Sequence, residues 1–297
     1  MKLLKAGRAR GWDNVPNEFL MNAPDEVLEA ITTLFNKVQS SGTIPSGWNK
    51  GRITLIFKRG IRELLNNYRP VTVIIALSGL YSRVLNSRLT QVVETHGLLG
   101  EEQNGFRSGR RTADNNFLVN SAIWKGKSVK QNVHFCFIDI SKAYDSVCRT
   151  LLWSRLSSLG IGGTFLQSLK ALYTGDSVES EVNGRLTRPV FLSRGLRQGC
   201  SLSPILFAIY ISGIGADLAA SSLGFPLGSF ILSGLLFADD IVLVSGDSGG
   251  LVQLVKLVKF HCDSLKLEIS VEKSRWSLQK MTCLGTFWRR RTRSCYL

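Results

Sequence analysis

The sequence predicts an α+β fold, because segments with a helical repeat of apolar residues alternate with short apolar runs of strand type. Apolar residues recur at helical spacing in segments 26–38, 75–94 and 251–265, whereas 53–57 and 133–138 are compact apolar runs. The chain has 297 residues, of which 44% are hydrophobic. That is enough to bury a substantial core in one large domain or two modest ones.

Turn and cap residues predict further elements in the second half of the chain. A helical repeat follows Tyr144 and ends at Gly160, where glycine favours a helix stop. Segment 203–214 opens with a Ser-Pro pair, which is typical of a helix N-terminus. An Asn-Gly pair within segment 182–190 predicts a β-hairpin.

The net charge of the chain indicates a polyanionic partner. Its 37 lysines and arginines outnumber its 22 acidic residues, which gives a net charge of +15 and a pI of about 9.8. Basic side chains that neutralise phosphates release counterions, so nucleic acid is the favoured partner. The alternative is that the positive charge serves solubility alone.

Cysteine usage and hydropathy predict the compartment. The six cysteines contain no C-x-x-C pair and the chain has three histidines, so we expect no zinc site and a reduced intracellular environment. The N-terminus lacks the apolar stretch of a signal peptide. The longest apolar segment, 205–216, contains a serine and two glycines. It is too short to span a bilayer and predicts a buried helix, so we expect no membrane association or secretion.

The pair Asp239–Asp240 interrupts an apolar hairpin. Segment 235–244 consists of two apolar half-strands with the two aspartates between them. Aspartate is a poor strand residue and is costly to bury without a partner. A turn is one explanation, but hairpin turns favour Asn-Gly or Asp-Gly, and adjacent like charges repel. A bound divalent cation would remove both objections, so we interpret the pair as metal ligands.

Asp139 forms a second site of the same kind. It ends the apolar run 133–138 and precedes a predicted helix, which places it at a sheet edge where functional sites gather. Capping of that helix is the alternative role. If the two strands lie side by side, their carboxylates can share two Mg²⁺ ions, with Mn²⁺ as a possible substitute, because oxygen ligands suit these metals better than zinc.

A third segment, 193–204, combines small residues with hydrogen-bond donors. Its glycines allow close backbone approach, and Arg197 and Gln198 offer donors beside Gly199. A plain loop-to-helix junction would explain the Ser-Pro pair that ends the segment. It would leave the Arg-x-x-Arg-Gln-Gly run unexplained.

These segments together resemble the successive core motifs of reverse transcriptases, with the closest resemblance to non-LTR (LINE-like) retrotransposons. The three core matches are 137–145 (FIDISKAYD), 197–204 (RQGCSLSP) and 237–240 (FADD), in the order of the family. Flanking matches extend the resemblance from residue 11 to about 288; they are 11–18, 57–60 with 67–70, 102–111, Leu267 with 272–274, and 283–285. Tyr144 stands where the family usually has Phe, and Ser201 and Ser270 replace a common Pro and Asn.

The resemblance implies a role for each matching residue. Asp139 and Asp239, assisted by Asp240, would be the catalytic metal ligands. Tyr144 would be the steric gate that excludes a 2′-hydroxyl. The remaining residues of the nucleotide site would be Lys58, Arg69, Gln198 and Lys273, the last as a general acid toward pyrophosphate. The residues that would contact template or primer are Gln103, Gly105, Phe106, Arg107, Arg110, Arg197 and Gly199.

The resemblance also implies an architecture and an activity. We expect residues 1–132 to form mainly right-hand polymerase fingers, with the start of the palm. Residues 133–288 would form mainly the palm, with an antiparallel sheet packed on helices, and 289–297 a basic tail. The thumb would be largely missing, and no endonuclease domain is expected. The expected activity is RNA-directed DNA polymerisation from dNTPs on an RNA template and a DNA primer, inside the cell, with the nucleus as the site of action.

Two alternatives remain open at this point. One is a catalytically idle nucleic-acid-binding remnant of a retrotransposon. The other is an RNA polymerase or nucleotidyl cyclase with a related palm. Tyr144 argues against an RNA polymerase, which must admit a 2′-hydroxyl, and the template-side segment 103–111 argues against a cyclase. The sequence does not indicate an oligomeric state.

Overall fold

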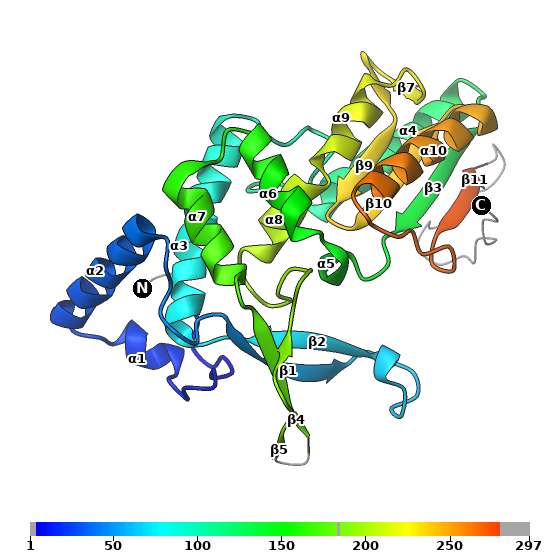
Figure 1. Ribbon diagram of the computed structural model, residues 1–297. Coiled ribbons are helices and arrows are strands. Elements are labelled where there is room, and N and C mark those ends of the chain that lie inside the picture. The colour runs from blue at the N-terminus through cyan, green and yellow to red at the C-terminus, as the bar shows by residue number, and fades with distance from the viewer. Residues whose placement is uncertain (1–3, 183–184, 280–297) are drawn as a thin grey trace. The chain divides into compact units, whose positions relative to one another are not determined.

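The computed structural model describes residues 4–182 and 185–279, which form two compact units (Figure 1). The first unit comprises Met1–Val92 and Arg149–Ser203, and the second comprises Val93–Cys148 and Pro204–Leu297. The units therefore interleave along the chain. The predicted hairpin turn at Asn183-Gly184, the match at 283–285 and the basic tail at 289–297 lie outside the described residues.

The first unit combines helices with a mixed sheet. Its sheet has the order β2-β1-β4-β5, with β6 paired to β4. β1 is antiparallel to β2 and parallel to β4. Its elements are α1 (Asn17–Met21), α2 (Asp25–Ser41), β1 (Lys50–Phe57), the 3₁₀ turn η1 (Leu65–Asn67), β2 (Tyr68–Val73), most of α3 (Ala76–Thr95), α6 (Arg149–Ser158), α7 (Gly163–Tyr173), β4 (Ser177–Val182), β5 (Arg185–Leu186) and β6 (Val190–Phe191).

Local sequence explains where several of these elements end. The helix predicted over 26–38 is α2, and it ends at Gly42, whose φ of 67° suits glycine at a helix C-terminus. The long helix predicted over 75–94 is α3. β2 contains Pro70, which is tolerated because β2 is an edge strand of its sheet.

The second unit is an antiparallel sheet covered by helices, as predicted for the palm. The sheet has the order β11-β3-β10-β9, and all three pairings are antiparallel. Its elements are α4 (Thr112–Ser128), β3 (Val133–Asp139), α5 (Ala143–Ser146), α8 (Ser203–Tyr210), α9 (Ser212–Ala220), β7 (Phe225–Leu227), β8 (Phe230–Leu232), β9 (Gly234–Phe237), β10 (Asp240–Ser245), α10 (Ser248–Ser264) and β11 (Arg275–Gln279).

Helices pack on both faces of this sheet (Figure 1). Ala122 and Ile123 of α4 form a buried cluster with Val133 and Phe135 of β3 and with Val244 of β10. On the other face, α10 packs on β3 and β10, and α9 packs on β9 and α10. β3 is therefore buried on both faces, which explains why its sequence is mostly apolar, with His134 the one polar residue before Asp139.

Two predicted helices are interrupted. The repeat after Tyr144 forms α5 and α6, because the chain leaves the second unit at Cys148, whose amide donates to the hydroxyl of Tyr210 at 3.3 Å. Segment 203–214 forms α8 and α9, broken at Ile211. The stretch Ser203–Ala220 is long and apolar enough to cross a membrane by length and composition. However, 67% of it is buried in the fold, which is what a core helix requires.

Candidate active site

The two acidic sites predicted from the sequence lie side by side in the second unit. β3 and β10 run antiparallel, and Asp139 at the end of β3 is opposite Asp240 at the start of β10. Asp239 precedes β10 in the turn that joins it to β9. Residues that are distant in the sequence are thus brought to one edge of the sheet.

The turn that carries Asp239 has an unusual residue. Its loop consists of Ala238 and Asp239, because Phe237 pairs with Asp240. Ala238 is buried and has a φ of 58°. A positive φ at the first loop residue alone corresponds to a type II′ hairpin turn, in which glycine is the usual residue. Contacts around Ala238 must therefore hold this strained conformation.

Lys273 lies beside Asp139 and partly balances its charge. The Nζ of Lys273 is 3.2 Å from Oδ1 of Asp139, and the two side chains are 67% and 32% exposed. Partial burial, followed by the carboxylates of Asp239 and Asp139, raises the pKa of Asp240, whereas Lys273 lowers it. The edge of the sheet is thus a region of negative charge that a cation would stabilise.

The donor chemistry of this edge fits a hard divalent cation, although the side chains would have to adjust. Within residues 4–182 and 185–279, no three His, Cys, Asp or Glu side chains could hold a metal ion as they stand. Asp139, Asp239 and Asp240 nevertheless offer only oxygen ligands, as Mg²⁺ and Mn²⁺ prefer. Their mutual repulsion would also be relieved by a positive ion.

A cavity of about 530 Å³ opens beside these aspartates, within the second unit. Its lining includes Asp139, Asp240 and Lys273, together with polar side chains of α4, among them Asn116 and Asn120. The volume lies within the range of small-molecule sites. The cavity offers neutral amide donors and acceptors next to the carboxylates.

Tyr144 lies in the same unit as the aspartates. It belongs to the short helix α5 that follows β3. Its ring stacks on Phe207 of α8, with centroids 5.1 Å apart and an interplanar angle of 25°. The stacking fixes the orientation of the ring, which a steric gate requires, and the residue is only partly buried.

Lys58 and Arg69 are exposed together at the β1–β2 hairpin of the first unit. Arg69 is opposite Ile56, and the amide of Lys58 donates to the carbonyl of Asn67 at 2.8 Å. Side chains alternate along a strand, so Lys58 and Arg69 share one face of the hairpin. Two neighbouring cations on one face can bind an anion such as a phosphate.

Gln198 and Gly199 pack against β2 in the same unit. The carbonyl of Gln198 accepts a hydrogen bond from the amide of Thr72 at 2.7 Å. Gly199 has a φ of 106°, and a Cβ there would lie 2.9 Å from the carbonyl oxygen of Thr72. Glycine is therefore required for this close approach. The contact places the Gln198 loop beside the strand that carries Arg69.

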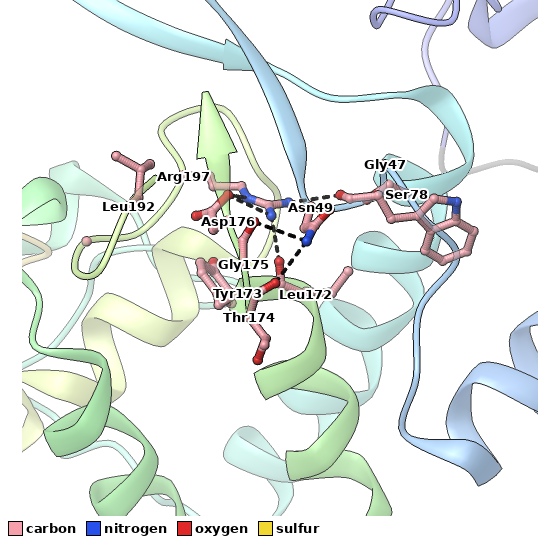
Figure 2. A network of polar contacts seen from close by, with 12 residues as sticks. Gly47, Asn49, Ser78, Leu172, Tyr173, Thr174, Gly175, Asp176, Leu192 and Arg197 are labelled. Atoms are coloured by element: carbon pink, nitrogen blue, oxygen red, sulfur yellow. Dashed lines mark hydrogen bonds and ion pairs between the residues drawn. The ribbon is translucent and has the colours of Figure 1, made fainter. Parts of the chain in front are cut away.

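Arg197 differs from its expected role as a template or primer contact. Its side chain is 2% exposed and pairs with the fully buried carboxylate of Asp176 at 2.9 Å (Figure 2). It also donates to the carbonyls of Leu172 and Trp48. Because these partners and its burial leave it inaccessible, we correct its role to that of a support for the loop that carries Gln198.

The partners of Arg197 were not identified from the sequence. Arg149 binds the other oxygen of Asp176 at 2.6 Å and donates to the carbonyls of Leu192 and Gly195. Both guanidinium groups lie over the ring of Tyr173, at 4.9 Å for Arg149 and 5.5 Å for Arg197. Burial is the main cause that raises the pKa of Tyr173, so its ring stays neutral. An isolated Arg or Asp in a sequence gives no signal of such a network.

The template-side motif divides into buried and exposed residues. Gln103, Gly105 and Arg107 are buried. Arg107 pairs with Glu94 at 2.9 Å and donates to backbone carbonyls. The expected direct contacts of these three residues with a template are therefore corrected to internal roles.

The other two residues of this motif remain accessible. Phe106 is 49% exposed, with a ring centroid 6.3 Å from that of Phe237. Arg110 is half-buried and pairs with Glu101 at 2.6 Å. Both side chains are therefore at least partly open to solvent.

Comparison with known proteins identifies the family. Residues 56–287 match the model of the family described as reverse transcriptase (RNA-dependent DNA polymerase). The chain belongs to the reverse transcriptase family. The match contains every predicted nucleotide-site and metal-ligand residue, from Lys58 to Lys273.

Its curated relatives come from retrotransposons, which confirms the resemblance to non-LTR elements. The chain is 31% identical over 205 residues to a Pol polyprotein of the type-1 retrotransposable element R2 of Popillia japonica, and it covers 28% of that protein. It is 25% identical over 279 residues to the transposon TX1 149 kDa protein of Xenopus laevis, of which it covers 21%. It is 25% identical over 243 residues to the jockey RNA-directed DNA polymerase of Drosophila funebris, of which it covers 26%.

Solved structures support the fold. The telomerase of Candida tropicalis, in complex with a fragment of telomeric RNA, matches 86% of the chain with a TM-score of 0.57 and 13% identity. The telomerase of Candida albicans matches the same share with a TM-score of 0.54 and 15% identity. The chain covers 45% and 46% of these proteins. The predicted polymerase fingers and palm fold is therefore confirmed.

Proposed function

We propose that this reverse transcriptase chain is an RNA-directed DNA polymerase that adds deoxynucleotides to a primer 3′-hydroxyl on an RNA template. The observation that carries the proposal is the pairing of Asp139 with Asp240 across β3 and β10, with Asp239 in the adjoining turn. An idle nucleic-acid-binding remnant would have no need to keep three carboxylates together at a cost in mutual repulsion.

Each residue of the site has a proposed task. Asp139 and Asp239, assisted by Asp240, would hold two Mg²⁺ or Mn²⁺ ions. When bound, such ions supply positive charge to the phosphates and lower the pKa of the attacking hydroxyl. Lys273, whose Nζ lies 3.2 Å from Oδ1 of Asp139, would give a proton to the departing pyrophosphate.

The first unit would bind the nucleotide. Lys58 and Arg69 share a face of the β1–β2 hairpin and would bind the triphosphate, where Arg can bind in a bidentate manner. Gln198 would line the nucleotide site. Its loop is fixed to β2 by the bond between Thr72 and Gln198.

The proposed partners are an RNA template, a DNA primer and dNTPs. Phe106 and Arg110 are the accessible residues of the template-side motif, one suited to stacking on a base and the other to binding a phosphate. The net charge of +15 agrees with a polyanionic partner. We further propose that the protein acts inside the cell, at the DNA of the nucleus.

Primer extension on poly(rA)/oligo(dT) tests this function. The purified chain is expected to extend the primer with dTTP in Mg²⁺, and to use UTP poorly. Salt-sensitive RNA binding without any dTTP incorporation would instead favour the idle remnant. Efficient use of UTP would favour an RNA polymerase.

Substitution of Tyr144 tests the steric gate. We expect Tyr144→Val to raise the incorporation of UTP relative to dTTP by about tenfold or more, because loss of the ring leaves room for a 2′-hydroxyl. Tyr144→Phe is the matched control. It keeps the ring and its stacking on Phe207, so the preference for dTTP should be unchanged, and the ratio of kcat/KM values for the two nucleotides measures the effect.

A further inference from the structure

A short segment of the template-side motif is hydrogen-bonded to β9, the strand that leads into the turn of Ala238 and Asp239. The amide of Leu236 in β9 donates to the carbonyl of Glu102 at 2.7 Å. The amide of Asn104 donates in turn to the carbonyl of Leu236 at 2.9 Å. Gln103, between these two bonds, forms an isolated parallel bridge with Leu236. Residues 102–105, which we call the strap, thus lie along the last residues of β9.

The side chain of Gln103 reaches from the strap into the turn. Its Oε1 accepts hydrogen bonds from the amides of Gly105 at 2.8 Å and Ala238 at 3.1 Å. Since both partners are N–H donors, the atom between them must be the amide oxygen. Gln103 is 2% exposed, so this pair of bonds is shielded from water.

Ala238 needs such a partner for two reasons. Its buried amide would cost free energy if it had no acceptor. Its φ of 58° is also unfavourable for a residue with a Cβ, so the turn would relax toward other conformations without restraint. Asp239 follows Ala238 directly, and any change of the turn moves its carboxylate.

The strap also touches the turn directly. A Cβ built on Gly105 would lie 2.3 Å from the amide nitrogen of Ala238 and 2.8 Å from the carbonyl carbon of Phe237. Only glycine allows this approach. Arg107 holds the strap, because it donates to the carbonyl of Gln103 at 3.4 Å. It also donates to the carbonyl of Gly100, just before the strap, at 2.9 Å and pairs with Glu94.

We propose that Gln103 is a positioning residue that fixes the turn of Asp239 through the backbone of Ala238. It makes no contact with the template. The proposal rests on the proposed function, because it assigns Asp239 a place among the metal ligands. When a residue that hydrogen-bonds to a metal ligand and orients it is replaced, metal affinity or activity typically falls by about 10–100-fold.

The test replaces Gln103 by methionine, which has a similar length and no amide oxygen. We expect Gln103→Met to speed the hydrogen exchange of the Ala238 amide about tenfold. We also expect it to weaken Mn²⁺ binding, followed by the EPR signal of the free ion, by about tenfold or more. In primer extension, kcat should fall while the KM for primer–template stays unchanged.

Two further variants keep the result interpretable. Gln103→Glu retains an acceptor oxygen and should keep the Ala238 amide protected. Gln131→Met is the matched control, because it makes the same exchange at an exposed position of the same unit. It should leave exchange, Mn²⁺ binding and extension unchanged.

A double-mutant cycle with Ala238→Gly separates positioning from general damage. Glycine adopts a positive φ without strain, so the turn should depend less on Gln103. The loss of Mn²⁺ affinity caused by Gln103→Met should therefore be smaller in the Ala238→Gly background. A loss of equal size in both backgrounds would contradict the proposal.

A raised KM for primer–template, with exchange at Ala238 and Mn²⁺ binding unchanged, would overturn the proposal in favour of a template contact. Failure of the proposed function is a separate result. In that case the unsubstituted chain does not extend a primer, yet exchange at Ala238 still reports whether Gln103 holds the turn.

Discussion

Alanine at Asp139 or at Asp239 is expected to abolish Mg²⁺-dependent primer extension. Each change removes a carboxylate from the edge where β3 meets β10. A bound metal supplies several kcal/mol to a reaction of this kind, and each 1.4 kcal/mol or so is worth about tenfold in rate. We therefore expect a loss of about a thousandfold or more in kcat, measured with dTTP on poly(rA)/oligo(dT).

Both variants should still fold and bind nucleic acid. Asp139 ends its strand, and its ion pair with Lys273 is largely exposed; such pairs contribute about 1 kcal/mol or less. Asp217→Ala is the matched control, since Asp217 is an exposed aspartate of α9 in the same unit. Extension that survives the loss of both Asp139 and Asp239 would refute the assignment of the active site.

The aspartate site could be predicted because its signal is local. An apolar run that ends in aspartate, and an apolar hairpin interrupted by two more, are each visible within ten residues of sequence. The structure adds the register, with Asp139 opposite Asp240. It also adds the conformation of Ala238, which turn preferences would have assigned to glycine.

The sequence does not predict helices that lack a clear helical repeat of apolar residues. α4 was not predicted, because its buried side includes Asn115 and Gly126 where a helical pattern would have apolar residues. Contacts with other parts of the fold explain both Asn115 and Gly126. The Nδ2 of Asn104 donates to Oδ1 of Asn115, and a Cβ on Gly126 would lie 2.5 Å from a methyl of Val133. Such reasons involve partners that the local sequence does not reveal.

For several charged and amide residues of the motifs, the sequence predicts an exposed side chain where the structure has a buried one. Arg197, Arg107 and Gln103 were expected to face nucleic acid, and all three are buried. A basic residue in a motif suggests a phosphate contact, yet burial depends on a distant partner. For Arg197 that partner is Asp176, and for Arg107 it is Glu94.

The largest expected effect on stability comes from Asp176→Asn. The substitution keeps the shape of the side chain but removes the charge that Arg149 and Arg197 share. Removing one partner of a buried ion pair costs about 3–5 kcal/mol, because the remaining charge stays buried without compensation. Two arginines are left in this case, so we expect a loss toward the upper end of that range, measured by urea unfolding.

A surface pair in the same unit provides the control for this effect. Glu181 lies 3.8 Å from Arg52, with side chains that are 51% and 29% exposed. Glu181→Gln also removes a charge and keeps the shape, but solvent screens the pair, so the expected loss is about 1 kcal/mol or less. Equal losses for the two variants would contradict the view that burial makes the Asp176 network important. The Asp176 network also supports the loop that carries Gln198. Through Arg149 it holds the carbonyls of Leu192 and Gly195, and Arg197 directly precedes Gln198. Partial unfolding of this loop in Asp176→Asn should therefore raise the KM for dNTPs.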